Sequence, residues 1–461
     1  MNERALSIDF LRGLAIVGMV LSGQMLWHAE LPAWLFHAQV PPPLFVFDPG
    51  VAGITWVDLV FPFFLFSMGA AFPLALRRRL ETKGESAASV VAGIVKRWVL
   101  LAFFAIALAN LRGNMLAGFT PRVAALIGLA AWACFGALFM RFDRLSAKAN
   151  RRVGCAAVAG LVGLMLLVKF AGGADVSVHR SDIIILVLAN MSLFGSLVWL
   201  CTRSNWRVRL ALVALIAASR VGATVDGSWT QALWNAQPVS WLMHVEYLKY
   251  LCIVLPGTLV GDLMWQRMQQ QPATGTPATA PWREGVVLLL LAGLFGVNMW
   301  GLFVREVSAT VEASALLGAL LLVLARKLRE NEIIVWGLFW LALGLCFEPF
   351  EGGIKKDYAT LSYFFVTSGL ASFTIAGVDI AVRRFGVPFR VLPACGQNPM
   401  VAYTAAGFLL MPLLVLTGLA PLLAKLAASG PWTGVLRGVL VTAGVMAVAV
   451  WFTRRKWFWR T

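Results

Sequence analysis

Long apolar runs recur along the chain and are separated by short polar clusters. A membrane-spanning helix needs about 20 mainly apolar residues. Runs of that length, or slightly shorter, cover 8–27, 57–76, 98–111, 122–140, 153–171, 182–201, 208–225, 245–265, 285–303, 307–325, 332–347, 360–381, 396–418 and 434–453. The pattern predicts an all-α protein: a polytopic transmembrane helical bundle with roughly 10–14 spans.

One polar stretch divides the apolar runs into two groups. Residues 266–284 read QRMQQQPATGTPATAPWRE, a composition typical of a flexible linker. We therefore expect an N-terminal transmembrane bundle over 1–265, a cytoplasmic linker over 266–284 and a C-terminal transmembrane bundle over 285–461. The sequence shows no internal repeat, which argues against a transporter built from inverted repeats.

Composition supports the membrane interpretation. Hydrophobic residues make up 60% of the chain and charged residues 13%, whereas soluble domains carry about a quarter charged residues. No small-residue cleavage site follows the first apolar run before Trp27 and His28. We therefore expect this run to remain as a span and not to be removed as a signal peptide.

The net charge of +17 is placed in short clusters between the apolar runs. With the N-terminus in the cytoplasm and the spans alternating, 27 of the 39 Lys and Arg residues fall on the cytoplasmic side, and none falls in the first outer loop, 28–56. The positive-inside rule then predicts that both termini are cytoplasmic. It also explains the charge without a nucleic-acid partner. We expect a bacterial inner membrane as the location.

The six cysteines lie within or beside apolar runs, without a CxxC pair and without a Cys/His spacing that suits zinc. This placement is typical of small buried apolar residues. The sequence therefore predicts neither disulfides nor a metal site.

Polar residues inside a membrane are costly, so those near the apolar runs are functional candidates. Asp9 and Arg12 in SIDFLRG are three residues apart and share a helix face; a simple boundary ion pair is the alternative. The loop 28–56 carries His28 and His37, which are ordinary loop histidines unless a partner orients them. Asp58 begins the next span, where it could cap the helix or orient a histidine.

Two late segments carry further candidates. The outer loop EPFEGGIKKDYATLSY (348–363) contains Lys355 and Lys356 among acidic residues, and a solvated loop is the alternative reading. The segment GQNPMVAY (396–403) places Asn398 directly before Pro399. An Asn followed by Pro is also typical of a helix N-cap.

Four segments together resemble one family. SIDFLRG, a following His-Ala step and VDLVFPFFLFSMG are similar to the start of the heparan-α-glucosaminide N-acetyltransferase family and its bacterial relatives. KKDYATLSY and GQNPMVAY resemble that family's late segments, in the same order and on the same predicted sides. The matched segments cover about a quarter of the chain, and the Asp-Leu-Val-Phe-Pro stretch is the most specific of them.

The resemblance implies a transmembrane acyltransferase that uses acetyl-CoA from the cytoplasmic side and acetylates a glycan or amino sugar on the far side. A homodimer is left open. Where lysosomal members carry an Asn after the first span, this chain reads VLSGQM, so Ser22 or Gln24 stands in that place. The resemblance implies a family core of about ten spans, and this chain is predicted to have about four more. This difference and the missing Asn leave the acceptor less determined than the acyl transfer. The predicted site comprises His37 and Asp58 as catalytic residues, Asn398, Tyr403 and Arg12 for acetyl-CoA, and Lys356 and Gln24 for the acceptor.

Two other functions are compatible with the sequence. Many spans and few polar residues also suit a transporter or a lipid-carrier flippase, whereas a purely structural membrane protein fits poorly with charges at membrane depth. Binding and slow hydrolysis of acetyl-CoA would distinguish the transferase. Within the first loop we favour His37 over His28, because Trp34 and Phe36 flank His37 and His28 follows the first span, where it would simply complement a helix C-terminus.

Overall fold

The computed structural model describes residues 6–269 and 280–460, and every regular element named in these ranges is a helix. The first half comprises α1 (Leu6–Gln24), α2 (Trp56–Arg77), α3 (Ala87–Asn110), α4 (Pro121–Phe139), α5 (Ala147–Phe170), α6 (Ile183–Thr202), α7 (Trp206–Gly222), α8 (Trp229–Trp234) and α9 (Leu251–Gln269). The second half comprises α10 (Pro281–Val304), α11 (Val307–Leu324), α12 (Asn331–Phe347), α13 (Leu361–Phe385), α14 (Val391–Gln397), α15 (Pro399–Ala405), α16 (Met411–Leu416), α17 (Ala420–Ala428) and α18 (Pro431–Arg454).

Five short 3₁₀ or π helices complete the helical elements. They are η1 (Ala33–Leu35), η2 (Arg78–Thr82), η3 (Gly113–Leu116), η4 (Val245–Tyr250) and η5 (Ala406–Leu410). Of these, η2 and η5 are π-helical. Because η5 joins α15 to α16, these three elements together form one span of 18 residues.

Among the described residues, twelve helical segments are long and apolar enough to cross a membrane. The chain is therefore an integral membrane protein with a polytopic helical bundle, as the sequence predicts. All fourteen predicted runs are helical, but α7 and α12 have only 17 residues each. Such a helix is about 26 Å long, at the lower end of the roughly 17–25 residues of a spanning helix. The predicted linker is also shorter than 266–284, because α9 continues to Gln269 and α10 begins at Pro281; residues 270–279 lie outside the described ranges.

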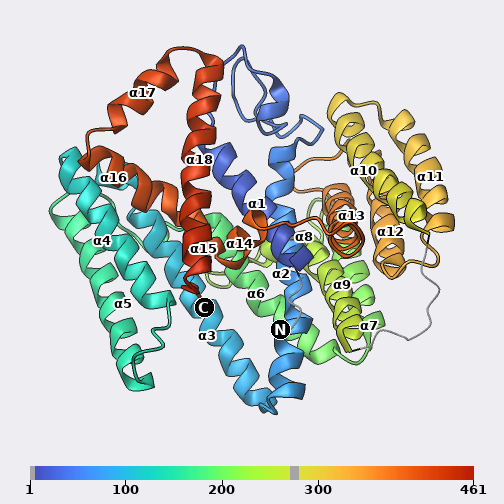
Figure 1. The fold of residues 1–461 in the computed structure, drawn as a ribbon, viewed down its shortest axis with the longest axis horizontal. Helices are drawn as coiled ribbons and strands as arrows, with labels where there is room; N and C mark the ends of the chain where they lie inside the picture. Colours follow the sequence, from blue (N-terminus) through green and yellow to red (C-terminus); the bar gives the residue numbers. More distant parts are fainter. Residues whose placement is uncertain (1–5, 270–279, 461) are drawn as a thin grey trace.

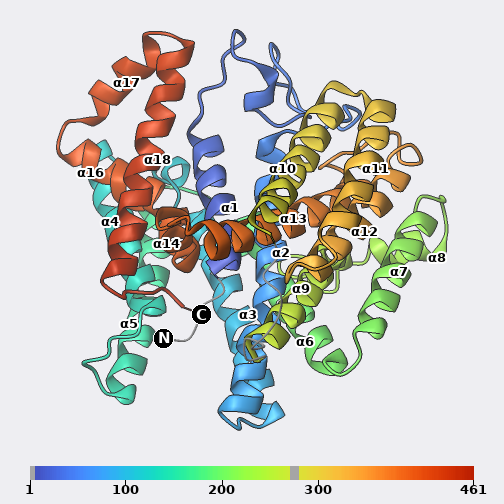
Figure 2. The same cartoon turned by 45° about the vertical axis from the view of Figure 1, so that its right-hand side comes forward.

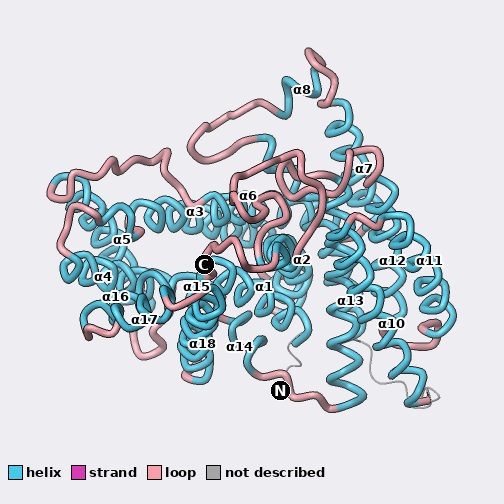
Figure 3. Tube along the Cα trace, turned by 90° about the horizontal axis from the view of Figure 1, so that it is seen from above, coloured by secondary structure: helices cyan, strands magenta, loops and turns pink. Residues whose placement is uncertain are grey.

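Helices α2, α6, α9 and α13 belong to the most buried spans of the bundle, whereas α4, α5 and α16 lie to one side and α10 to α12 to the other (Figures 1 and 3). In an apolar stretch of 18 residues within each span, the share of buried residues falls from 83% for α13 to 17% for α5. An outward-facing apolar helix such as α5 has only lipid available to cover it. Burial therefore separates the helices that build the interior from those that form the lipid-facing surface.

Small residues bring α2 and α9 together at the centre. A Cβ atom added to Gly257 would lie 2.3 Å from the Phe66 carbonyl oxygen, and one added to Gly69 would lie 2.1 Å from that of Val254. In lipid there is no hydrophobic driving force between helices, so close backbone packing of this kind supplies the association energy. This contact fixes α2, which carries Asp58, to the core of the bundle.

The last helices of the chain pack against the first one. Helices α14 and α18 both contact α1, and Figures 1 and 2 show the red C-terminal helices beside the blue α1. A Cβ atom on Gly396 would lie 1.9 Å from the Asp9 carbonyl oxygen. The two sequence-defined bundles thus share an interior, and the first span is built between helices from both.

Candidate functional site

Asp58 and His37 are in direct contact. Asp58 lies in the first turn of α2, is 1% exposed, and uses its two carboxylate oxygens differently. Its Oδ2 accepts the backbone N–H of Thr55 at 2.9 Å and that of Ala38 at 3.2 Å. Its Oδ1 lies 2.7 Å from His37 Nδ1. Capping and orientation of a histidine, which the sequence presented as alternatives, are therefore both carried out by this one carboxylate.

A lysine from the other half of the chain completes the cluster. Lys356 Nζ lies 3.2 Å from His37 Nδ1 and 3.3 Å from Nε2. Because Nδ1 already faces Asp58, the Nδ1–H tautomer donates to the carboxylate, and the Nε2 lone pair faces the Lys356 ammonium at 3.3 Å. The side chain of His37 is 33% exposed, whereas that of Asp58 is 1% exposed. The arrangement is that of an oriented base or nucleophile with a cation beside it.

Two loops are joined to bring Lys356 to His37. Gln39, which is 2% exposed, accepts the backbone N–H of Asp357 at 2.9 Å and donates to the Asp357 carbonyl oxygen. Gly53 N–H also donates to the Ile354 carbonyl oxygen at 2.7 Å. The loop after α1 therefore binds the loop after α12.

The acidic residues of the late loop are structural. Glu348 is 2% exposed and pairs with Arg305. The Glu351 carboxylate accepts the N–H groups of Leu361 and Ser362 at 2.7 and 2.8 Å, which satisfies the first turn of α13. The alternative of a merely solvated loop is therefore wrong for these two carboxylates.

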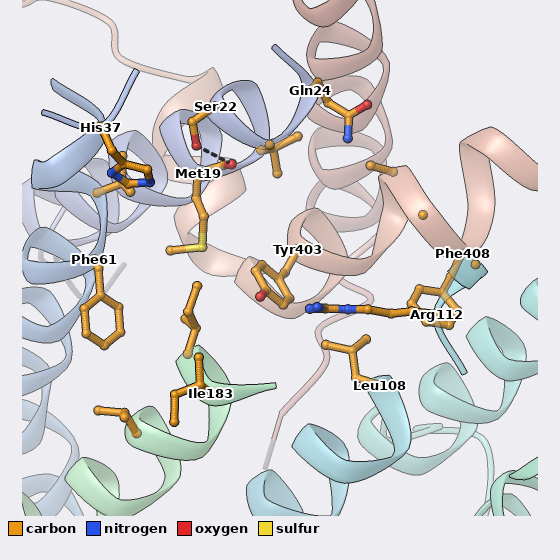
Figure 4. A pocket seen from close by; sticks show the side chains of 18 of the residues that line it. Met19, Ser22, Gln24, His37, Phe61, Leu108, Arg112, Ile183, Tyr403 and Phe408 are labelled. Carbon is orange, nitrogen blue, oxygen red and sulfur yellow. Dashed lines mark hydrogen bonds between the residues drawn. The ribbon is translucent and has the colours of Figure 1, made fainter. Parts of the chain in front are cut away.

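A cavity of about 820 Å³ opens beside the cluster, and His37 and Lys356 both line it. Figure 4 shows His37, Met19 and Tyr403 facing the same space, with Gln24 at its edge. We call this space the histidine cavity. Of the two residues that stand in place of the family's Asn, Gln24 lines it, and Ser22 lines it while donating its hydroxyl to the Met19 carbonyl oxygen at 3.0 Å.

A second cavity of about 310 Å³ lies next to the first, and three arginines line it: Arg12, Arg97 and Arg460. We call it the arginine cavity. Arg12 also lies 3.6 Å from Asp9 and donates to the Ser67 carbonyl oxygen at 3.2 Å. The boundary ion pair expected for Asp9 and Arg12 is thus present, and the same guanidinium also faces a cavity. Arg97 Nε is buried and has no hydrogen-bond partner among the described residues.

The other two predicted acetyl-CoA residues, Tyr403 and Asn398, differ in their contact with the cavities. Tyr403 lines both cavities, but its hydroxyl donates to Asp182 Oδ2 at 2.9 Å. Asn398 is fully buried and lines neither cavity. Its amide donates to Thr453 Oγ1 at 2.8 Å and accepts the Trp459 N–H at 3.2 Å.

Asn398 therefore does not contact either cavity, and its side chain does not cap α15. It instead holds the segment that carries Arg460 against the break between α14 and α15. This broken helix needs such contacts, because a freed backbone inside a bundle must find partners within the protein. Asn398 thus makes a positioning contact, and its role in binding acetyl-CoA stays a prediction.

His28 stands apart from the cluster. It is exposed, and its Nδ1 accepts the backbone N–H of Glu30 at 3.3 Å. Sequence reasoning missed Gln39 and Tyr363, although Tyr363 ends the KKDYATLSY segment and its hydroxyl donates to the Asp58 carbonyl oxygen at 2.6 Å. Within the described ranges, no group of three or more His, Cys, Asp or Glu side chains could hold a metal ion.

Comparison with known families gives one match. Residues 4–264 match a family described as a domain of unknown function, DUF5009. The match covers more than half of the chain and includes both His37 and Asp58. No curated protein matches the chain.

Proposed function

The chain belongs to the DUF5009 family, and we propose that it is a transmembrane acyltransferase that moves an acetyl group from acetyl-CoA to a sugar or cell-envelope glycan. The observation that carries the proposal is the contact of Asp58, His37 and Lys356 at the wall of a cavity that adjoins an arginine-lined one. Imidazole oriented by a buried carboxylate is suited to acyl transfer.

The arginine cavity suits the nucleotide half of acetyl-CoA. Arginine side chains bind phosphates through several N–H donors, and Arg97 Nε has no hydrogen-bond partner within 6–269 and 280–460. Arg12 lies twelve residues before Gln24 on α1, so its Cα is about 18 Å along the helix axis from the histidine cavity's edge. A nucleotide held at the arginines would leave its thioester arm to extend along α1 toward His37.

Transfer follows from the cluster's geometry. His37 Nε2 attacks the thioester carbonyl carbon, the carbon–sulfur bond breaks, and CoA leaves as a thiolate that takes up a proton. An acceptor amine or hydroxyl then attacks the acetyl-imidazole and loses its proton as Nε2 regains its lone pair. In the direct alternative, the acceptor attacks the thioester carbonyl carbon while Nε2 removes the acceptor's proton; the carbon–sulfur bond then breaks, and Nε2–H gives that proton to the departing thiolate. In both routes Lys356 supports the negative charge that develops on the carbonyl oxygen.

The proposed orientation places the histidine cavity outside and the arginine cavity at the cytoplasmic face, in a bacterial inner membrane. It follows from the charge bias of the sequence. Acetyl-CoA is then taken from the cytoplasm and the glycan is modified on the other side.

The test is acetyl-CoA turnover by the purified protein. We expect wild-type protein to bind acetyl-CoA and release free CoA slowly without an acceptor. His37→Ala should bind acetyl-CoA as wild type does and lose at least 10²–10⁴ in rate, whereas the matched His28→Ala should keep most of the activity. Absence of both binding and CoA release in wild type would refute the transferase and favour a transporter or flippase.

A further inference from the structure

An apolar cavity of about 410 Å³ lies between α10 and the helix pair α1 and α2. We call it the apolar groove. Every residue that lines it is apolar or glycine, and three of them are tryptophans, Trp34, Trp56 and Trp300. The histidine and arginine cavities, in contrast, are lined by charged side chains. The apolar groove therefore suits a hydrocarbon and not a polar ligand, which would lose its hydrogen bonds to water there.

The groove opens on the flank of the bundle, where the protein meets lipid. Its rim includes Leu14 on α1 and Trp300 on α10, which are 37% and 61% exposed. Gly296, one turn before Trp300, is also exposed. Its floor includes Phe63 and Met299, which are only 2% and 4% exposed. Because α1 and α10 are long and apolar enough to span a membrane, lipid is the medium that covers this flank.

The groove occupies the half of the membrane on the His37 side. The loop that carries His37 lies at the same ends of α1, α2 and α10 (Figure 1). Phe63 follows the first residue of α2 by seven positions, about 10 Å along the helix axis. Leu14 lies ten positions before the last residue of α1, about 15 Å along the axis. Because half of the hydrocarbon core is also about 15 Å thick, the groove has the depth of a single leaflet.

Aromatic contacts close the groove at both ends. Near the loop, Trp34 packs against Phe303 of α10 with ring centroids 5.2 Å apart. At the deep end, the rings of Phe63 and Phe295 lie 6.3 Å apart. Helix α10 has its main helix contacts with α11 and α13. The described residues therefore leave the space between the two aromatic contacts open.

We infer that the apolar groove binds a hydrocarbon chain of a membrane lipid from the leaflet on the His37 side. Water does not suit the groove, because a buried water needs about two to four polar partners. An empty groove would forfeit the van der Waals contacts of its lining. A chain from the adjacent leaflet supplies these contacts without leaving an apolar environment.

The bound chain lies beside the segments that carry the catalytic candidates. Trp34 precedes His37 by three positions, and Trp56 precedes Asp58 by two. The groove thus gives the protein a lipid ligand next to the cluster. This inference does not rest on the proposed function, because it uses neither acetyl-CoA nor the arginine cavity.

Photocross-linking in a bilayer tests the site. The full chain is reconstituted into phosphatidylcholine vesicles that contain a small fraction of phosphatidylcholine with a diazirine in the middle of one acyl chain. After illumination, the modified residues are mapped by mass spectrometry. We expect products at Phe63 and Met299, because only a chain inside the groove reaches these buried side chains.

Gly296→Phe blocks the groove. Gly296 lines it, and a Cβ atom added there would meet no atom within 4 Å, so the new ring takes up groove space without displacing the protein. We expect the products at Phe63 and Met299 to be lost. Gly163→Phe on α5 is the matched control, because Gly163 is exposed and has the same open space. It should keep the wild-type pattern.

The outcomes are distinct. Wild-type products on exposed residues such as Trp300 and on α5, with none on the groove floor, would show that lipid surrounds the bundle without entering. Floor products that persist in folded Gly296→Phe, or that vanish equally in Gly163→Phe, would overturn the assignment to the groove. If Gly296→Phe does not fold, Gly296→Leu and Gly163→Leu make the same comparison with a smaller side chain. Absence of acetyl-CoA turnover would remove the proposed function and leave this lipid site standing.

Discussion

Replacing Asp58 by Asn tests the orientation of His37 with almost no change in shape. The amide oxygen can take the place of Oδ2, which accepts the N–H groups of Thr55 and Ala38 at 2.9 and 3.2 Å. The amide NH₂ then takes the place of Oδ1, 2.7 Å from His37 Nδ1. An NH₂ donates to Nδ1, so the ring must carry its proton on Nε2. Nε2 then has no free lone pair for attack or proton removal.

The expected magnitudes differ for activity and stability. The same carboxylate-to-amide change beside a catalytic histidine lowers kcat by about 10⁴ in serine proteases, where it also imposes the wrong tautomer. The capping hydrogen bond from Thr55 and the loop hydrogen bond from Ala38 are kept, so the free energy of unfolding should fall by no more than about 1 kcal/mol through the cap. Lys356, which is only partly buried, loses its carboxylate neighbour but keeps access to water.

The assay is single-turnover release of CoA from acetyl-CoA, together with the acetyl-CoA dissociation constant and the melting temperature. Asp58→Asn should lower the release rate by about 10⁴ and leave the dissociation constant unchanged. Asp48→Asn is the matched control, because Asp48 Oδ1 accepts only a local N–H, that of Gly50, in the same loop. A release rate for Asp58→Asn within about tenfold of wild type would show that the contact between Asp58 and His37 does not orient a catalytic base.

Three further changes are predicted. Gln39→Ala removes both hydrogen bonds to the Asp357 backbone and should lower acetyl-CoA turnover without weakening acetyl-CoA binding. A turnover rate equal to that of wild type would show that this loop contact is not needed to hold Lys356 at His37. Gly257→Leu should lower the free energy of unfolding by about 1–3 kcal/mol or more, measured by thermal unfolding, whereas Gly163→Leu, with open space around its Cβ position, should not. Cysteines placed in 270–279 should react with impermeant thiol reagents from the cytoplasmic side alone, and labelling from the opposite side would reverse the predicted orientation.

The sequence was sufficient for the fold class because bilayer thickness imposes a local rule. Each span must be a run of about 20 apolar residues with its backbone hydrogen bonds inside the helix, so the runs can be read without knowing what they pack against. The rule is least reliable near its lower limit. Helices α7 and α12, with 17 residues each, are the two predicted runs that lie at this limit.

The candidate site was only partly readable from the sequence. His37 and Asp58 were found because they lie 21 residues apart in segments with a family resemblance. Gln39 carries no such signal, since a buried glutamine in a loop is identified by its partner and not by its neighbours in sequence. Asn398 shows the opposite case: its motif suggested a ligand contact, but both ends of its amide are occupied by Thr453 and Trp459.

The tertiary structure decided everything that depends on residues far apart in the chain. Lys356 reaches His37 across 319 positions, and Tyr403 reaches Asp182 across 221. The adjoining cavities are likewise formed by helices from both ends of the chain. Apolar periodicity shows that a helix spans a membrane, but not which faces pack together, because lipid and protein interiors are equally apolar. Which polar residues meet is decided by close packing at small residues such as Gly69, Gly257 and Gly396.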